Sequence, residues 1–408
     1  MKVHSVTRYY DVIVIGAGAA GMIAAVTAAE RMRSVLLLEK SDRPGRKILA
    51  SGNGRCNLMN SGEFRYFGSP DFARKVFETT SREKLSSFFA TYGLLMTEDS
   101  EKRIYPLTFQ SSTVVAVLRN AIEKNRVKLC PSSPAVNVSK NKDGFDVRTE
   151  AGDTFRSKAL IIACGGAAMP KLGGTFDGYR ILQSMGHSLI SVTPSLVSMN
   201  TDSRSISGLS GIRTRCRVMI IRNGKILHSE SGEVLFTDYG ISGICIMQCA
   251  RYADQPGTLV VLNLLSNAFP DRKTAEEEIR RRRSLFHDSS PVWLLNGILP
   301  EKISFAVLKQ AGFALRGETA GETDDAAIGR ILEAAYGYRI TVTGIRGLDQ
   351  AQVTAGGIDC GEFNPYTMES LLVHRLFAAG EVLNVDGDCG GFNLMFAFAS
   401  GMTAGNAV

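Results

Sequence analysis

The chain has 408 residues, of which 44% are hydrophobic and 21% charged, and its formal net charge is +7. This length exceeds the roughly 250–300 residues that a single core supports, so we expect more than one domain. The composition excludes a disordered chain, and no apolar run approaches the ~20 residues of a membrane span. Residues 1–10 lack the apolar stretch of a secretory signal, which predicts a cytoplasmic protein.

The first predicted elements lie at residues 11–21, DVIVIGAGAAG, an apolar run followed by glycines and then a helix-forming stretch. Gly16, Gly18 and Gly21 have the GxGxxG spacing, which allows a tight turn, close approach of a pyrophosphate and close packing of helix on strand. The second apolar run, VLLLEK, ends near Glu39, where a carboxylate can accept hydrogen bonds from ribose hydroxyls. The order of these features predicts a dinucleotide-binding domain.

The next stretch, GRKILASGNGRC at 45–56, has neither helical nor strand periodicity, and we expect a flexible glycine-rich loop. An NAD domain usually continues with another strand and helix at this point. Arg46, Lys47 and Arg55 suit a pyrophosphate and an electron-rich ring, because cations offset negative charge and glycines permit close approach. A mobile surface loop is the alternative.

The middle of the chain predicts a continued parallel sheet and then two inserted parts. ALIIACGGAAMP, from residue 159, is an apolar strand that runs into glycines. From about 191 the pattern alternates, and Asn223-Gly224 between apolar runs indicates a hairpin. Residues 270–337 are charged and helical in pattern, and strands return after 338. No second strand–GxGxxG–helix unit follows, so a separate nicotinamide domain is not expected.

The last segment predicts a strand, a glycine-rich turn and an apolar helix. The turn contains Gly390 and Gly391, and Asn393 stands where the helix begins. A helix that starts there can direct its positive end and its free N–H groups at negative charge on a bound ligand. A purely structural cap is the alternative.

Several residue types carry less information. The eight cysteines form no CxxC pair, so we expect reduced thiols and no metal site. Cys245 and Cys249 stand one helical turn apart without nearby partner ligands, which favours buried core. The five histidines are too scattered for a catalytic triad. Arg280–Arg283 are spread around a helix, which favours a solvated surface over a nucleic-acid patch.

The glycine-rich stretches together resemble the HI0933-like or BaiN-like family of NAD(P)/FAD-dependent oxidoreductases. The resemblance spans nearly the whole chain and includes RIYPLT (103–108), GEVLFTDYGISG (232–243), VTAGGI (353–358) and LFAAGEVLNVDGDCGGFNLMFAFASG (376–401). It implies bound FAD and redox chemistry on a small organic substrate. The fold it implies is a Rossmann-like α/β domain with a parallel sheet, interrupted by an antiparallel β domain and a small helical domain.

We therefore expect an FAD-binding domain at 1–190 and 354–408, a β domain at 191–268 and 338–353, and a helical insert at 269–337. The expected cofactor is non-covalent FAD, with NAD(P)H as a transient electron donor and no metal. The predicted cofactor-binding residues are Gly16, Gly18, Ala19, Ala20, Gly21, Glu39, Lys40, Arg46, Lys47, Ser51, Gly52, Asn53, Gly54, Arg55, Cys56, Asn57, Gly165, Gly166, Gly380, Glu381, Gly390, Gly391, Asn393 and Leu394.

Three functions remain open on this basis. The first is hydride transfer to or from a small organic substrate with a C=C bond next to a carbonyl. The second is oxidation of a small amine, as in aminoacetone oxidases, and the third is a flavin-stabilised RNA-binding or RNA-modifying protein. Candidate catalytic groups are Tyr105, Cys56 and Arg55, although the tyrosine and the thiol can equally be structural.

Overall fold

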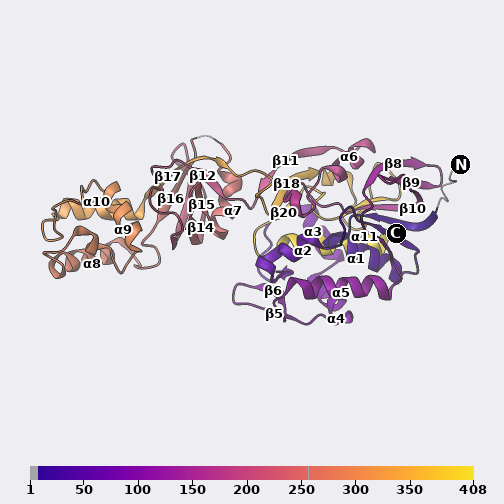
Figure 1. The fold of residues 1–408 in the computed structure, drawn as a ribbon, viewed down its shortest axis with the longest axis horizontal. Coiled ribbons are helices and arrows are strands. Elements are labelled where there is room, and N and C mark those ends of the chain that lie inside the picture. Colours follow the sequence, from indigo (N-terminus) through magenta and orange to yellow (C-terminus); the bar gives the residue numbers. More distant parts are fainter. Residues whose placement is uncertain (1–7, 256) are drawn as a thin grey trace. The chain divides into compact units, whose positions relative to one another are not determined.

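The chain divides into two compact units, which a computed structural model describes over residues 8–255 and 257–408 (Figure 1). The first unit combines Met1–Pro194 with Gln352–Val408, and the second is Ser195–Ala351. Both ends of the chain therefore contribute to the first unit, and the second is an insertion between them.

A mostly parallel, seven-stranded sheet forms the centre of the first unit, in the order β7-β2-β1-β10-β9-β8 with β19 paired to β10. The strands β1 and β2 are continuous β-branched and leucine-rich runs, as expected where both faces of a sheet are covered. The strands of this sheet are β1 (Arg8–Ile15), β2 (Val35–Leu38), β7 (Lys128–Cys130), β8 (Ala135–Asn141), β9 (Gly144–Thr149), β10 (Thr154–Ile162) and β19 (Leu376–Ala378).

The other elements of this unit surround the sheet. Its helices are α1 (Ala19–Glu30), α2 (Arg46–Ala50), η1 (Ser51–Gly54), α3 (Pro70–Thr79), α4 (Arg82–Thr91), α5 (Ser111–Lys124), η2 (Pro170–Leu172), α6 (Asp177–Ser184), η5 (Cys360–Glu362) and α11 (Phe392–Ala407). Its short strands are β3 (Met59–Asn60), β4 (Tyr66–Gly68), β5 (Met96–Glu98), β6 (Arg103–Pro106), β11 (Leu189–Ser195), β18 (Val353–Ile358) and β20 (Val385–Gly387).

The stretch 45–56 corrects one prediction, because it is partly helical rather than an irregular loop. Gly45 takes a left-handed conformation and begins α2, and its N–H donates to the Ala17 carbonyl at 2.9 Å. Ile48 points into the core with 1% of its surface exposed. Tertiary contacts therefore fold a segment whose own sequence is too short and too glycine-rich to show a helical period.

The second unit is a closed antiparallel barrel with a helical insert. Asn223 and Gly224 both have positive φ in the turn between β13 and β14, which confirms the predicted hairpin. The barrel strands are β12 (Met199–Thr201), β13 (Arg213–Arg222), β14 (Lys225–Phe236), β15 (Gly240–Ser242), β16 (Leu259–Asn263) and β17 (Tyr338–Ile345). The helices of this unit are α7 (Ile244–Cys249), η3 (Ala250–Tyr252), α8 (Arg272–Leu285), η4 (Pro291–Leu294), α9 (Glu301–Gln310) and α10 (Asp325–Tyr336).

The four consecutive arginines lie on α8 beside acidic side chains. Arg280 pairs with Glu276 and Asp325, and Arg281 pairs with Glu278. This pairing offsets the positive charge of the run, in agreement with a solvated helix surface. Cys245 and Cys249 are buried on α7, as predicted for core residues.

Helices α1 and α11 pack directly against each other through small residues. A Cβ atom at Gly401 would lie 2.3 Å from the Ala20 carbonyl oxygen, and one at Gly405 would lie 2.5 Å from the Ala24 carbonyl oxygen. The matched order of these contacts shows that the two helices run in the same direction. Within the described ranges, no helix has the length and apolar character needed to cross a membrane.

We expect the Gly401→Ala variant to lower the free energy of unfolding of the first unit by about 1–3 kcal/mol, because the added methyl group forces the two helices apart. Urea unfolding followed by circular dichroism measures this change. The control is Gly329→Ala in α10, where no described atom lies within 4 Å of the added Cβ. That half-buried helical position gains about 0.5–1 kcal/mol, because alanine is the better helix former. Equal effects of the two substitutions would contradict the packing argument.

Candidate functional site

The carboxyl ends of four parallel strands meet at one edge of the sheet. Ile15 is in register with Leu38 and with Ile162, and Ile162 is in register with Ala378. The segments that follow these strands therefore assemble at this edge, although they are far apart in the sequence. They contain the predicted residues Gly16, Gly18, Gly21, Glu39, Gly165, Gly166, Gly380 and Glu381. In open α/β sheets, ligands bind outside this edge.

The three glycines of the first turn have three different surroundings. Gly16 has φ +102° and its Cβ position lies 2.5 Å from the Ala163 carbonyl oxygen, so the turn is tight and backed by β10. A Cβ at Gly21 would lie 1.8 Å from the Gly16 carbonyl oxygen. At Gly18, by contrast, no atom of the described chain lies within 4 Å of that position. The backbone at Gly18 is therefore open to a bound group, as a pyrophosphate requires.

Glu39 lies against this turn. Its Oε2 accepts a hydrogen bond from the Ala17 N–H at 2.8 Å, and its Oε1 accepts one from the Ser41 N–H at 2.7 Å. These contacts fix the carboxylate beside the glycine turn. Each oxygen retains acceptor capacity, so the residue fits the hydroxyls of a ribose.

Two predicted cations have protein partners at this edge. Lys47 forms an ion pair with Glu381 at 3.0 Å, and the other oxygen of Glu381 accepts a hydrogen bond from the Thr354 N–H at 2.8 Å. Arg46 donates to the Lys171 carbonyl at 2.8 Å. The charge of Lys47 is therefore largely offset by Glu381, which leaves it less available to a bound anion than the sequence indicated.

A second group of predicted residues surrounds the N-terminus of α11. Gly391 is left-handed, and its Cβ position lies 2.6 Å from Asn57 Oδ1 and 2.4 Å from the Met59 carbonyl oxygen. Asn60 Nδ2 donates to the Gly390 carbonyl at 2.8 Å. The Oδ1 atom of Asn57 is buried and has no hydrogen-bond partner among the described residues. An N–H donor on a bound group would satisfy this oxygen, which is the fit expected for a flavin ring.

Asn393 has a role that the sequence did not show. Its Oδ1 accepts from the Gly387 N–H and its Nδ2 donates to the Gly387 carbonyl, both at 2.8 Å. The side chain thus fixes the turn before α11. The first N–H groups of the helix, including that of Leu394, lack intrahelical acceptors and remain available to negative charge.

The stretch Gly52–Cys56 lies beside Tyr105 on β6. Gly52, Asn53 and Cys56 all have φ between +54° and +56°, a left-handed conformation that is rare for cysteine. A Cβ at Gly52 would lie 3.8 Å from Tyr105 Cε1. The structure therefore brings all three candidate catalytic groups, Tyr105, Arg55 and Cys56, into one region.

Burial raises the pKa of the Tyr105 phenol, while the nearby Arg103 and Arg55 guanidinium groups act in the opposite direction. The phenol is therefore protonated at neutral pH, and the two guanidinium groups offset part of the cost of forming its anion. Arg103 was not among the predicted site residues, although its i, i+2 spacing from Tyr105 on one strand places both on the same face. Burial also raises the pKa of Cys56 to about 11, so this thiol is not a thiolate at pH 7.

The N-termini of α1 and α11 point the same way but end at different levels. Gly401 lies at the level of Ala20; α11 begins nine residues before Gly401, and α1 begins one residue before Ala20. At 1.5 Å per residue, the two positive helix ends are offset by about 12 Å along the axis. This offset suits an extended ligand with a pyrophosphate at one end and an electron-rich ring at the other.

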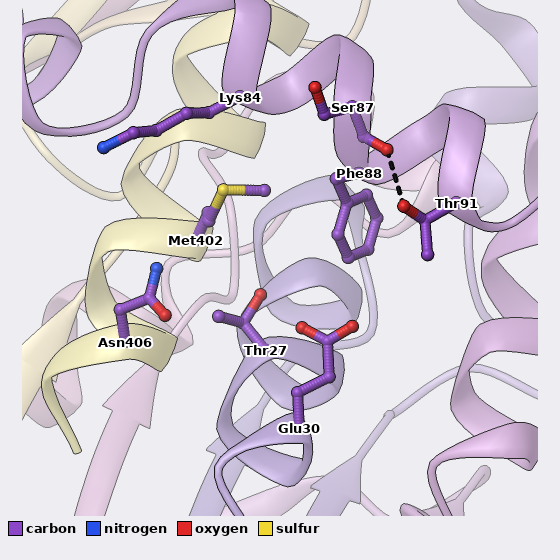
Figure 2. A pocket seen from close by; sticks show the side chains of 8 residues that line it. All are labelled: Thr27, Glu30, Lys84, Ser87, Phe88, Thr91, Met402 and Asn406. Atoms are coloured by element: carbon purple, nitrogen blue, oxygen red, sulfur yellow. Dashed lines mark hydrogen bonds between the residues drawn. The ribbon is translucent and has the colours of Figure 1, made fainter.

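A separate cavity of about 230 Å³ lies at the opposite ends of these helices (Figure 2). It is lined by Thr27, Glu30, Lys84, Ser87, Phe88, Thr91, Met402 and Asn406. None of the predicted site residues lines it, so it is not part of the candidate active site. No group of three or more metal-ligating side chains occurs within residues 8–255 and 257–408.

The glycine turn, Glu39 and the offset helices fit an FAD-dependent oxidoreductase with a Rossmann-like domain. The chain belongs to the HI0933-like family, because the family model for the HI0933-like protein Rossmann domain matches residues 10–407.

Comparisons with individual proteins agree with this family. The chain is 33% identical over 406 residues to a 3-dehydro-bile acid delta(4,6)-reductase of Clostridium scindens, covering 97% of this chain and 98% of the relative. It is 30% identical over 407 residues to a ribosomal RNA dihydrouridine synthase of Haemophilus influenzae, covering 97% of each. The solved 3-ketosteroid delta1-dehydrogenase from Sterolibacterium denitrificans has the same fold, with a TM-score of 0.51 at 13% identity and coverage of 98% of this chain and 99% of that one.

We expect Gly18→Val to abolish most flavin binding without unfolding the protein. The open space at Gly18 accepts a side chain, so stability changes by less than about 0.5 kcal/mol, whereas the valine occupies the place of the pyrophosphate. Dinucleotide affinity falls by at least about tenfold, or 1.4 kcal/mol. Flavin absorbance of the purified variant and its melting temperature measure the two effects.

The matched control is Gly21→Val, in which the new side chain collides with the Gly16 carbonyl. This variant loses stability as well as flavin. Full flavin occupancy in Gly18→Val would contradict the prediction that the pyrophosphate binds at this turn.

Proposed function

We propose that this protein is an FAD-dependent reductase of carbon–carbon double bonds conjugated with a carbonyl group. The observation that carries the proposal is the position of Tyr105, a protonated phenol beside the Gly52–Cys56 stretch. Reduction of such a bond needs a hydride at the β-carbon and a proton at the α-carbon, so a positioned acid is required. The name of the Clostridium scindens relative describes a reduction of this type.

The residues of the two groups described above would hold FAD without a covalent link. When bound, FAD supplies the hydride chemistry. Gly18 and the start of α1 would bind the pyrophosphate, Glu39 the ribose, and the start of α11 the ring edge. Because the sequence has only one strand–GxGxxG–helix unit, we propose that NAD(P)H binds transiently as electron donor.

In the proposed reaction, Tyr105 donates its phenolic proton to the α-carbon of the substrate. Arg103 and Arg55 stabilise the phenolate that remains, and water returns the proton afterwards. Backbone N–H groups at the start of α11 stabilise negative charge that develops near them. These roles need no thiolate, in keeping with the raised pKa of Cys56.

Anaerobic photoreduction of the purified protein tests the reaction class. Reoxidation of the reduced protein by a panel of enones, faster than by oxygen, supports the reductase. Rapid reoxidation by oxygen and turnover of aminoacetone would instead indicate an amine oxidase.

A second candidate function has the same bond chemistry. The C5=C6 bond of uracil is conjugated with the C4 carbonyl, and the Haemophilus influenzae relative is a ribosomal RNA dihydrouridine synthase. Incubation of the reduced protein with ribosomal RNA that lacks dihydrouridine, followed by mass spectrometry of the nucleosides, tests this function. New dihydrouridine would establish RNA as the substrate.

We expect Tyr105→Phe to lower enone turnover about 100-fold or more, because the proton donor is lost. Flavin occupancy stays unchanged, since the ring still packs beside Phe109 at 5.5 Å. The acid is active only when protonated, and its raised pKa keeps the wild-type rate constant up to the ordinary tyrosine pKa of 10 and beyond. A pH profile of turnover measures this limit. A Tyr105→Phe variant with full activity and the same alkaline limit would exclude Tyr105 as the acid.

A further inference from the structure

An apolar strip leads outward from Tyr105 along the hairpin β5–β6. Met96 is paired with Pro106, and the Leu107 N–H donates to the Leu95 carbonyl at 2.8 Å, so the ladder continues beyond β6. Leu107 lies opposite Leu95 at the start of the turn that follows β6. The ring of Phe109 lies 5.5 Å from that of Tyr105. We call Leu95, Leu107 and Phe109 the apolar lip.

The three side chains of the apolar lip are all exposed to solvent. Leu95 is 68% exposed, Leu107 55% and Phe109 44%. Their position, next to the candidate acid and close to one another, makes them a patch rather than scattered surface residues.

The backbone at Phe109 supports a functional role for the apolar lip. Its φ is +50°, a left-handed conformation that side chains other than glycine, asparagine and aspartate adopt rarely. The Phe109 N–H donates to the Pro106 carbonyl at 2.8 Å and closes the turn. A glycine would fit this turn with less strain, and the ring that stands there packs beside Tyr105.

The charge of the surrounding segments indicates what the apolar lip contacts. Residues 91–97 and 104–118 contain no charged side chain. A surface that followed an RNA backbone would need lysines or arginines along its length. An uncharged strip beside a proton donor instead fits the carbon skeleton of a small molecule.

We propose that the apolar lip binds the apolar ring system of the substrate and thereby sets specificity for bulky apolar enones. This inference rests on the proposed reductase function and assigns the residues that hold the part of the substrate remote from the reacting bond. The apolar lip then contributes to substrate affinity, whereas Tyr105 transfers the proton.

The test separates binding from turnover. The probe is a saturated steroid ketone, androstanedione, which has no C=C bond to reduce; its dissociation constant is measured from the change in flavin absorbance of the FAD-bound protein. We expect Leu95→Asn with Leu107→Asn to weaken this binding about tenfold or more, because apolar contact area is lost. The matched control is Leu372→Asn, a leucine 54% exposed elsewhere on the first unit, which leaves binding unchanged.

A second variant excludes misfolding as the cause. Phe109→Gly relieves the left-handed conformation, so its melting temperature stays equal or rises, while androstanedione binding weakens. For turnover, KM for androstenedione rises at least about tenfold in the two-leucine variant, and KM for cyclohexenone, which is too small to reach the apolar lip, changes less than about twofold.

Three results would overturn the assignment. The first is unchanged androstanedione binding in both variants. The second is an equal rise of KM for the large and the small enone. The third is salt-dependent binding of a uridine-containing RNA oligonucleotide that Phe109→Gly abolishes, because the ring would then stack on a base. If the wild-type protein reduces no enone but androstanedione binding still depends on the apolar lip, the proposed reaction fails and the binding surface stands.

Discussion

The close contact between α1 and α11 is the constraint on which the rest of the first unit depends. The contact exists because Gly401 and Gly405 present no side chain to the carbonyl oxygens of Ala20 and Ala24. Its geometry fixes both the parallel direction of the helices and the offset between their positive ends. One helix end can contact only one electron-rich part of a ligand. The fixed offset between the two helix ends selects a ligand whose two electron-rich parts are separated by the same distance.

Local features of the site could be read from the sequence because each depends on neighbouring residues. The turn Gly16–Gly21 and the hairpin at Asn223-Gly224 follow from backbone conformations that few residue types adopt. The short helix α2 was missed because its stability comes from Ile48 and from the hydrogen bond between Gly45 and Ala17, which are contacts with distant elements.

The hydrogen-bond and ion-pair partners of the predicted residues could not be predicted from the sequence either. Lys47 was expected to suit a pyrophosphate, but it forms an ion pair with Glu381, a residue 334 positions further along the chain. The bridge that Asn393 makes to Gly387 is local, yet an asparagine at a helix start reads equally as a cap. Sequence patterns thus predict which residues lie at a site. They do not predict which of those residues form ion pairs or hydrogen bonds with one another.

The pairing of the first and last segments also constrains the order in which the protein can assemble during synthesis. Strand β19 completes the sheet next to β10, and α11 covers α1, so the ligand-binding unit lacks a helix and a strand until almost the whole chain has emerged from the ribosome. The second unit, Ser195–Ala351, is continuous in sequence and contains the local hairpin β13–β14. It can therefore fold before residues 376–407 have been synthesised, and until then the surfaces of β10 and α1 that contact β19 and α11 remain exposed.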